Sequence, residues 1–386
     1  MPSRTRARSA ITSVALLAAF VGACATPPVG SVVPPTITPP TDAPATSALA
    51  LATSLTSDVA IHWDLDSELK KTGFIQEVVR GPDGSVAIGG CFPERAFECP
   101  QVWLSTDDRT WTRHPLPHRW PDVWPNAIAV SATGYVISGA ERDLNGSRPL
   151  PEAQRWLRIW TSPNGEAWTR AGVLEIADEA QFLAAAPTGR IIVGTGALVG
   201  SSTGLYSSTD AVKWRTVKPA DLGVETLRVE YLESTDTEVV LAGTRCLGCG
   251  HLLWTSTDGV HWVAKGQLPG PPYSIATDGH VRVFTWGPDI WSSTDDGPWV
   301  LRYSRSGLED TKVVFGDARF LVVGGDLDGY ALLSSTDGLT WATVPIDGLP
   351  AYYDDDCSPG WFTVAGGTVL LGEGICPYWR GTIRAP

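Results

Sequence analysis

The chain has 386 residues, of which only 18% are charged, whereas Gly (40), Pro (30) and Trp (17) are abundant. Long amphipathic helices need periodic blocks of Ala, Leu, Glu and Lys, and no such block occurs after residue 60. The composition therefore indicates an all-β protein of many short strands. The formal net charge of −13 argues against nucleic-acid binding, which depends on Lys and Arg that neutralise phosphates.

Residues 1–23 are predicted to be an export signal. Arg4, Arg6 and Arg8 form a basic segment, and residues 11–23 are an apolar run that is too short to span a bilayer comfortably. The run leads into Val-Gly-Ala-Cys at 21–24, which resembles the lipobox where bacterial lipoprotein signals are cleaved before an acylated Cys. Cys24 is therefore the predicted lipidation site, and its lipid anchors the protein at the extracytoplasmic face of the cell membrane. The alternative is an ordinary secretory signal with an unrelated Cys.

Residues 24–57 are predicted to be the lipidated Cys followed by a disordered tether. The segment is rich in Thr, Ser and Ala, has few large apolar residues, and contains Pro27, Pro28, Pro34, Pro35, Pro39, Pro40 and Pro44. Such a composition cannot bury enough apolar surface to fold. Cleavage before Cys24 removes three Arg and no acid, so the formal charge of the mature chain falls from −13 to −16.

The six cysteines after Cys24 are predicted to form disulfides. An even number of Cys in an exported chain suggests three bonds. Fifteen pairings are possible, and proximity along the chain favours Cys91–Cys99, Cys246–Cys249 and Cys357–Cys376. The alternative for Cys246 and Cys249, half of a redox or zinc site, lacks a second Cys pair or a nearby His pair.

A seven-residue segment that begins with Ser and ends with Trp, here called the turn motif, occurs six times after short apolar and aromatic strands. The copies span residues 105–111, 162–168, 208–214, 256–262, 293–299 and 335–341. A motif that recurs about every 40–50 residues marks one supersecondary unit of a repeat architecture.

A second recurring element, upstream of the turn motifs, is an apolar strand that ends in small residues. Its seven copies lie at 86–90, 135–139, 191–195, 239–243, 281–285, 320–325 and 368–372. Another short strand and a tight turn precede each copy, so each unit is predicted to contain four antiparallel strands, a to d, with the turn motif between c and d. Such units, arranged radially, form the blades of a β-propeller. The sequence thus predicts an all-β, seven-bladed β-propeller.

The seventh unit, residues 361–386, stops after a predicted strand c at 378–384 and lacks strand d. Residues 59–66 resemble the strands that follow the turn motifs, such as 111–115. We therefore predict that residues 58–66 supply strand d of the seventh blade and close the ring, so that residues 58–386 form one propeller domain.

The turn motif resembles the Asp-box, or BNR repeat, of propellers in sialidases, sortilin-type receptors, xyloglucanases and photosystem assembly factors. The resemblance covers residues 58–386 and implies a structural role for two residues of each copy. Side-chain oxygens of the Ser and the acid are expected to accept hydrogen bonds from the turn backbone, and the Trp ring is expected to be buried. These residues are Asp107, Trp111, Asn164, Trp168, Asp210, Trp214, Asp258, Trp262, Asp295, Trp299, Asp337 and Trp341. The spacing from acid to Trp is four residues rather than the family's five, and Asn164 replaces Asp.

The a–b and c–d turns of a blade lie on one face of a propeller, and the b–c and d–a connections lie on the other. The face opposite the turn motifs therefore carries the loops that differ between blades, where function usually resides. The candidate ligand-binding residues in these loops are His118, Arg119, Trp120, Trp124, Arg155, Trp156, Tyr352, Tyr353, Asp354, Asp355 and Asp356. Trp and Tyr beside Arg and carboxylates suit stacking on sugar rings, and they equally suit a protein interface. The alternative is that these aromatic rings only pack onto the blades.

Two kinds of glycoside hydrolase are weighed against the sequence. A sialidase needs three converging Arg, the first in an Arg-Ile-Pro-like motif near the first blade, where this chain has Gly-Phe-Ile-Gln-Glu at 73–77. A glycosidase with two catalytic carboxylates could draw on Glu141, Asp289, Asp326, Asp328 and Glu373, but spacing along a sequence cannot show the separation that the reaction requires.

The sequence favours an extracytoplasmic, lipid-anchored propeller that binds a glycan or an extracytoplasmic protein and is not an enzyme. We expect a monomer without a cofactor or a bound metal, in contact with the membrane only through its lipid. The alternatives are a glycoside hydrolase of sialidase-like or xyloglucanase-like type and an assembly factor for a membrane complex.

Overall fold

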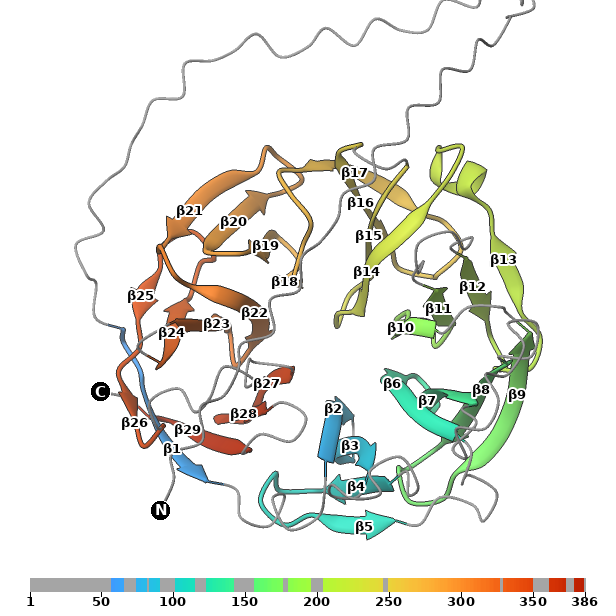
Figure 1. Ribbon diagram of the computed structural model, residues 1–386, viewed down its shortest axis with the longest axis horizontal. Coiled ribbons are helices and arrows are strands. Elements are labelled where there is room, and N and C mark those ends of the chain that lie inside the picture. Colours follow the sequence, from blue (N-terminus) through green and yellow to red (C-terminus); the bar gives the residue numbers. More distant parts are fainter. Residues whose placement is uncertain are drawn as a thin grey trace, which may run out of the picture. The chain divides into compact units, whose positions relative to one another are not determined.

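The computed structural model describes residues 57–65, 74–81, 83–90, 101–114, 123–141, 156–175, 180–195, 204–245, 249–326, 329–349, 361–372 and 378–384. These residues form seven β-sheets that surround a common centre (Figure 1). In this part of the chain the only helix is a single 3-10 turn, η2 (Pro219–Leu222), and no helix is long and apolar enough to cross a membrane. The predicted all-β, seven-bladed propeller is confirmed.

Each blade contains strands a to d in chain order from the centre outward, with the seventh as the exception. Blade 1 contains β2 (Phe74–Gly81), β3 (Gly84–Gly90), β4 (Gln101–Ser105) and β5 (Thr112–His114). Blade 2 contains β6 (Val123–Ser131), β7 (Gly134–Glu141), β8 (Trp156–Ser162) and β9 (Thr169–Glu175). Blade 3 contains β10 (Ala180–Ala185), β11 (Ile191–Thr195), β12 (Leu205–Ser208) and β13 (Arg215–Val217). Blade 4 contains β14 (Arg228–Ser234), β15 (Val239–Thr244), β16 (His251–Ser256) and β17 (Val263–Leu268). Blade 5 contains β18 (Ser274–Thr277), β19 (Val281–Trp286), β20 (Asp289–Thr294) and β21 (Val300–Ser304). Blade 6 contains β22 (Glu309–Gly316), β23 (Arg319–Asp326), β24 (Gly329–Ser335) and β25 (Ala342–Thr343). Blade 7 contains β27 (Trp361–Ala365), β28 (Thr368–Gly372), β29 (Trp379–Arg384), β1 (Ala60–Leu65) and β26 (Ile346–Asp347).

The N-terminal strand closes the ring, as predicted. β1 pairs antiparallel with β29, from Ala60 opposite Arg384 to Leu65 opposite Trp379. Ile61 and Trp63 of β1 are buried in the core of blade 7. One feature was not anticipated: the short strand β26 pairs parallel with the other edge of β1 and gives this blade a fifth strand.

Strand b of each blade lies between two neighbouring blades, which explains its continuous apolar sequence. All residues of β11 and of β15 are buried. Val193 of β11 packs in one cluster with Ile159 of β8, and Leu241 of β15 packs in another with Ile192 of β11. Each fully buried side chain of this size contributes about 1.5–3 kcal/mol, so contacts between blades are the main source of stability.

The turn motif connects strands c and d in six blades, and in five copies the acid, or the Asn that replaces it, holds the turn together. In the first copy, Oδ1 of Asp107 accepts hydrogen bonds from the backbone N–H groups of Arg109 (2.8 Å) and Thr110 (2.7 Å) and from the Ser105 hydroxyl (3.1 Å). These bonds, that to Thr110 first, lower the pKa of Asp107 to about 2. The copies at 162–168, 208–214, 256–262 and 335–341 repeat this arrangement.

The residue after the acid has a positive φ in all six copies. These residues are Asp108 (56°), Gly165 (79°), Ala211 (57°), Gly259 (69°), Asp296 (62°) and Gly338 (66°). Gly adopts this left-handed conformation without strain, which explains its presence in three copies. In two copies an acid stands there instead and is held by an Arg, Asp108 by Arg80 and Asp296 by Arg282.

Where the acid of the turn motif accepts hydrogen bonds from the turn backbone, it is expected to stabilise the fold by about 1 kcal/mol per copy. Asp337→Ala removes the acceptor for the N–H groups of Leu339 and Thr340 and for the Ser335 hydroxyl. Urea denaturation should therefore show a loss of about this size. Asp295→Ala is the matched control, because the described contact of the Asp295 carboxylate is with the His280 ring (3.4 Å), not with the turn backbone. An equal loss in both variants would contradict the role assigned to the acid.

Ring closure predicts that removing residues 57–65 from the mature chain lowers the melting temperature sharply. The deletion strips blade 7 of β1 and of the buried side chains of Val59, Ile61 and Trp63, and truncating a single buried Trp already costs about 3–5 kcal/mol. Circular dichroism measures the transition. Deletion of residues 25–50, the predicted tether, is the control, and an equal effect of the two deletions would show that β1 does not close the ring.

Candidate functional site

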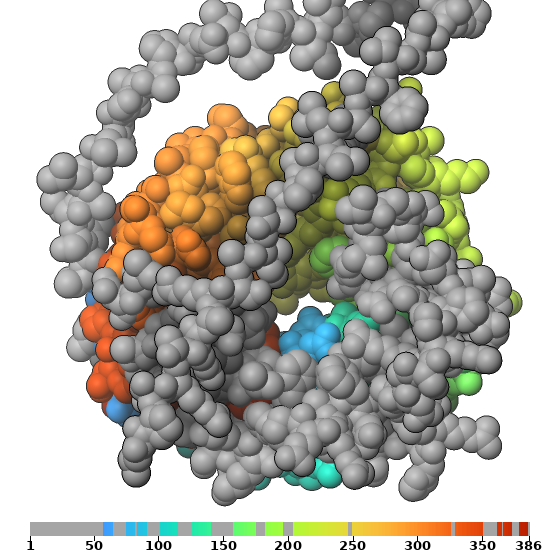
Figure 2. All heavy atoms as spheres, in the orientation of Figure 1, coloured from blue at the N-terminus to red at the C-terminus, as the bar shows by residue number. Residues whose placement is uncertain are grey.

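The face opposite the turn motifs, here called the loop face, is where strand a of each blade begins and strand b ends. The strands a enclose the centre of the ring, and Figure 2 shows an opening there beside the blue atoms of β2. Side chains at the start of each strand a therefore lie near the rim of this central opening.

Five of the seven strands a carry a β-bulge near their loop-face end. The register shifts lie between Ile75 and Glu77, Pro125 and Ala127, Ala180 and Phe182, Val229 and Tyr231, and Glu309 and Lys312. The extra residues are polar: Gln76, Asn126, Gln181, Glu230, and Asp310 with Thr311. Bulges redirect side chains and are over-represented beside active sites. The loop-face ends of these five inner strands are thus irregular.

Side chains from the strands a bond to the backbone of the next blade. A Glu77 carboxylate oxygen accepts from the N–H of Ile128 in β6 (2.9 Å), and the Tyr231 hydroxyl accepts from the N–H of Ile275 in β18 (3.0 Å). These contacts satisfy backbone groups that would otherwise be unpaired at the inner edge of each sheet. They also fix the side chains around the opening.

Three charged side chains on the inner strands of blades 1, 4 and 6, Glu77, Glu233 and Lys312, influence one another electrostatically. Burial raises the pKa of Glu77 in β2 to about 7. The hydrogen bond from Ile128 and the positive charge of Lys312 in β22 lower this pKa, but their effect is smaller. Burial raises the pKa of Glu233 in β14 to about 8, and the charge of Glu77 raises it further while Lys312 lowers it. The Glu233 side chain is exposed to solvent, and this exposure weakens the effect of burial on its pKa. Carboxyl groups that titrate near neutral pH are suited to donate or accept a proton.

The raised pKa values predict that the fold loses stability as the pH rises. A carboxyl group with a higher pKa in the folded state holds its proton more tightly when folded, so its contribution is complete below the unfolded value of 4.5 and is lost as the pH passes through about 8 for Glu233. Differential scanning fluorimetry from about pH 5 to about pH 9 should show a smaller fall in melting temperature for Glu233→Gln than for the wild type. Glu225→Gln, at an exposed position, is the control and should follow the wild type. Identical pH profiles for all three proteins would refute the assignment.

Two aromatic side chains are exposed on the loop face of blade 5 and form what we call the aromatic shelf. Tyr273 is 43% exposed and Trp286 is 36% exposed. The Tyr273 N–H donates to the carbonyl oxygen of Thr285 (2.9 Å), which fixes its position beside the end of β19. The indole of Trp286 lies against Gly270, where an added Cβ would come within 2.1 Å of the ring. Trp286 therefore packs against Gly270, and both rings remain open to solvent.

A hydrogen bond between a Glu and a His side chain lies on the loop face of blade 4. Glu230, the extra residue of the β14 bulge, reaches Nδ1 of His251 at the start of β16 (2.6 Å), and both side chains are largely buried. The bulge thus aims a carboxylate outward along the face rather than into the opening.

Most of the ligand-binding residues predicted from the sequence lie outside the described residues. They are His118, Arg119, Trp120, Arg155, Tyr352, Tyr353, Asp354, Asp355 and Asp356. The backbone places Trp124 near the start of β6 and Trp156 at the start of β8, both at the loop face. Their roles remain predictions.

The other site predictions are tested only in part. Among the described residues, no group of three or more His, Cys, Asp or Glu side chains is arranged to hold a metal ion. Of the six cysteines expected to pair, only Cys249 lies within the described residues, so the three disulfides stay predictions. Asp289, Glu141 and Asp326, considered as catalytic carboxylates, lie at loop-face ends of strands.

No sequence pattern predicted Glu77, Glu233, Lys312, Tyr273 or Trp286 as site residues. When the seven strands a are aligned, blades 1, 4 and 6 have a charged residue at positions where most other blades have an apolar one. This difference could have indicated Glu77, Glu233 and Lys312. No such difference marks Trp286, because an aromatic residue at the end of an apolar strand is normally expected to be buried in the core.

The fold defines the class of protein as a seven-bladed β-propeller. The sequence matches no protein-family model, and no curated protein matches it. Among solved structures, a streptogramin B lyase (TM-score 0.56, 11% identity) matches 84% of this chain and 98% of its own. A virginiamycin B lyase from Staphylococcus aureus (0.53, 12%) matches 84% and 99%, and the GH74 xyloglucanase from Xanthomonas campestris (0.54, 15%) matches 83% and 53%. This chain therefore shares its fold with lyases and hydrolases, and identities this low say nothing further about activity.

Proposed function

We propose that the protein is a lipid-anchored, extracytoplasmic β-propeller that binds a glycan on its loop face, with the turn motifs as Asp-boxes of the scaffold. The export signal, Cys24 and the Pro-rich tether support the location. The repeated bonds of the motif acids to the turn backbone support the scaffold role.

The aromatic shelf is the observation that carries the glycan proposal. Trp286 and Tyr273 expose ring surface on a fixed backbone, so binding a ligand there costs little side-chain entropy. Sugar rings present C–H groups that pack on aromatic faces and hydroxyls that need polar partners. Glu230 and Asp310, at the β-bulges of the neighbouring blades 4 and 6, are the polar residues proposed to supply such partners.

A glycan array probed with the mature chain tests this function. Trp286→Ala and Tyr273→Ala should each weaken binding about tenfold or more, as truncation of a central aromatic residue does at binding sites. Val212→Ala is the control, because Val212 is 53% exposed but belongs to a turn motif on the opposite face. Binding that is unchanged in both shelf variants would overturn the glycan site. Binding to an extracytoplasmic protein instead would favour the role of assembly factor.

A glycoside hydrolase or polysaccharide lyase is the second candidate, favoured by one observation. Burial raises the pKa of Glu77 to about 7 and that of Glu233 to about 8, and the charge of Glu77 adds to the second shift. A general acid that protonates a leaving group and a general base that accepts a proton both need pKa values near the working pH. Shorter products released from the bound glycan by the wild type, and not by Glu77→Gln, would replace the binding role with catalysis.

A further inference from the structure

The aromatic shelf has a carboxylate at its edge. Trp286 and Asp289 face each other across the two-residue turn that joins β19 to β20. Directly opposite residues of an antiparallel pair point to the same face of the sheet, with their Cβ atoms about 4.5–5.5 Å apart. The Asp289 side chain is half-buried, and none of the residues that the structure describes forms a hydrogen bond or an ion pair with its carboxylate. A ligand that stacks on the indole can therefore also reach this carboxylate.

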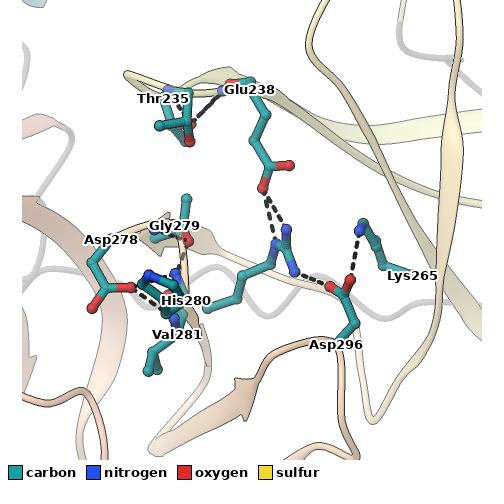
Figure 3. Close-up of polar contacts among 11 residues, drawn as sticks. Thr235, Glu238, Lys265, Asp278, Gly279, His280, Val281 and Asp296 are labelled. Carbon is teal, nitrogen blue, oxygen red and sulfur yellow. Dashed lines mark hydrogen bonds and ion pairs between the residues drawn. The ribbon is translucent and has the colours of Figure 1, made fainter.

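An ion-pair network at the other end of β19 holds blades 4 and 5 together. Arg282 of β19 donates to Glu238 of blade 4 (3.0 and 2.7 Å) and to Asp296 of its own blade. Figure 3 shows this network with Lys265 of blade 4, whose Nζ lies 2.6 Å from a carboxylate oxygen of Asp296. Because the Trp286 ring packs against the connection between these two blades, the network fixes the surface on which the ring lies. A ligand therefore meets an ordered site, and its binding costs little side-chain entropy.

The charge around the shelf is negative. The turn between β19 and β20 is bonded to β22 of blade 6, since the Thr311 hydroxyl donates to the carbonyl oxygen of Gly287 (3.0 Å). The charged residues of segments 286–289 and 305–312 are Asp289, Glu309, Asp310, Arg305 and Lys312. Acids thus outnumber bases by three to two. The resulting field opposes an anionic ligand and has little effect on an uncharged one.

The groups on the shelf match an uncharged sugar ring. A carboxylate accepts two hydrogen bonds side by side, and hydroxyls on adjacent ring carbons supply two donors at a suitable separation. The face of the same ring packs on the Trp286 indole. The Tyr273 hydroxyl, which has no partner in the described part of the chain, can donate to a further sugar oxygen. A uronic acid would instead bring a second negative charge beside Asp289.

Building on the proposed glycan binding, on which this inference rests, we propose that Asp289 determines the specificity of the aromatic shelf. Its carboxylate accepts hydrogen bonds from two adjacent hydroxyls of the sugar that stacks on Trp286. The shelf therefore selects uncharged glycans with two free adjacent hydroxyls and disfavours uronic acids.

Indole N–H signals of the mature chain labelled with 15N-Trp test this specificity. Trp286→Phe identifies the signal of Trp286 by its loss. The probes are β-1,4-linked tetrasaccharides of glucose and of mannose, each compared with the corresponding uronic acid tetrasaccharide. At least one neutral probe should shift the Trp286 signal, and its uronic acid counterpart should bind at least about threefold more weakly, as expected for two like charges near a protein surface.

Two variants at position 289 separate the hydrogen bonds from the charge. Asp289→Ala should weaken binding of the neutral probe about tenfold, the effect of losing hydrogen bonds to a charged group. Asp289→Asn keeps an acceptor but not the charge, so it should narrow the preference for the neutral probe over its uronic acid counterpart. Asp236→Asn is the matched control, because it removes an exposed acid from a turn on the opposite face and should change neither affinity.

Three results would overturn the proposal. The first is a uronic acid probe that binds as tightly as its neutral counterpart, and the second is an Asp289→Ala variant that binds like the wild type. Both would leave glycan binding by the shelf intact. The third is a Trp286 signal that moves with none of the probes. The glycan array with Trp286→Ala then shows whether the shelf binds another glycan, so failure of the specificity is distinguished from failure of the proposed function.

Discussion

The pairing of β1 with β29 is the contact on which the rest of the structure depends. Blades are held by apolar packing between neighbouring strands b, and such packing is complete only when every blade has two neighbours. β1 completes blade 7 with Ile61 and Trp63 and so joins the first described residues of the chain to the last. The rigid ring that results allows single side chains such as Glu77 and Trp286 to be held in defined positions on its rim.

β-Bulges recur in the edge strands of the blades. Inner strands carry bulges near the loop face, and the outer strand β17 carries one at Lys265. A bulge admits one extra residue without breaking the sheet and turns it away from the ladder. Regular positions of the repeat therefore supply stability, while the extra residues are available for recognition.

The sequence was sufficient for the architecture, because repetition makes the pattern visible. The turn motifs and the apolar strands b located all seven blades, and the orphan strand at 58–66 identified the closure. The inner strands were harder to interpret, since a bulge shifts the alternation by one residue and a strand such as 74–81 does not reveal which of Gln76 and Glu77 faces the opening. The pKa values of Glu77 and Glu233 depend on contacts between blades 1, 4 and 6, which no local pattern contains. The exposure of Trp286 likewise depends on Gly270, which lies in the connection between β17 and β18.

The placement of β1 between β26 and β29 also determines the order in which the protein can fold. Synthesis begins at the N-terminus, yet residues 60–65 have no strand to pair with until residues 346–347 and 379–384 have emerged. Contacts between such distant segments are slow to form, because a long loop must close first. Six blades can therefore assemble on a nascent chain while the ring stays open. Its first and last blades expose apolar faces until the final strand arrives, and this interval is when the protein is most exposed to aggregation.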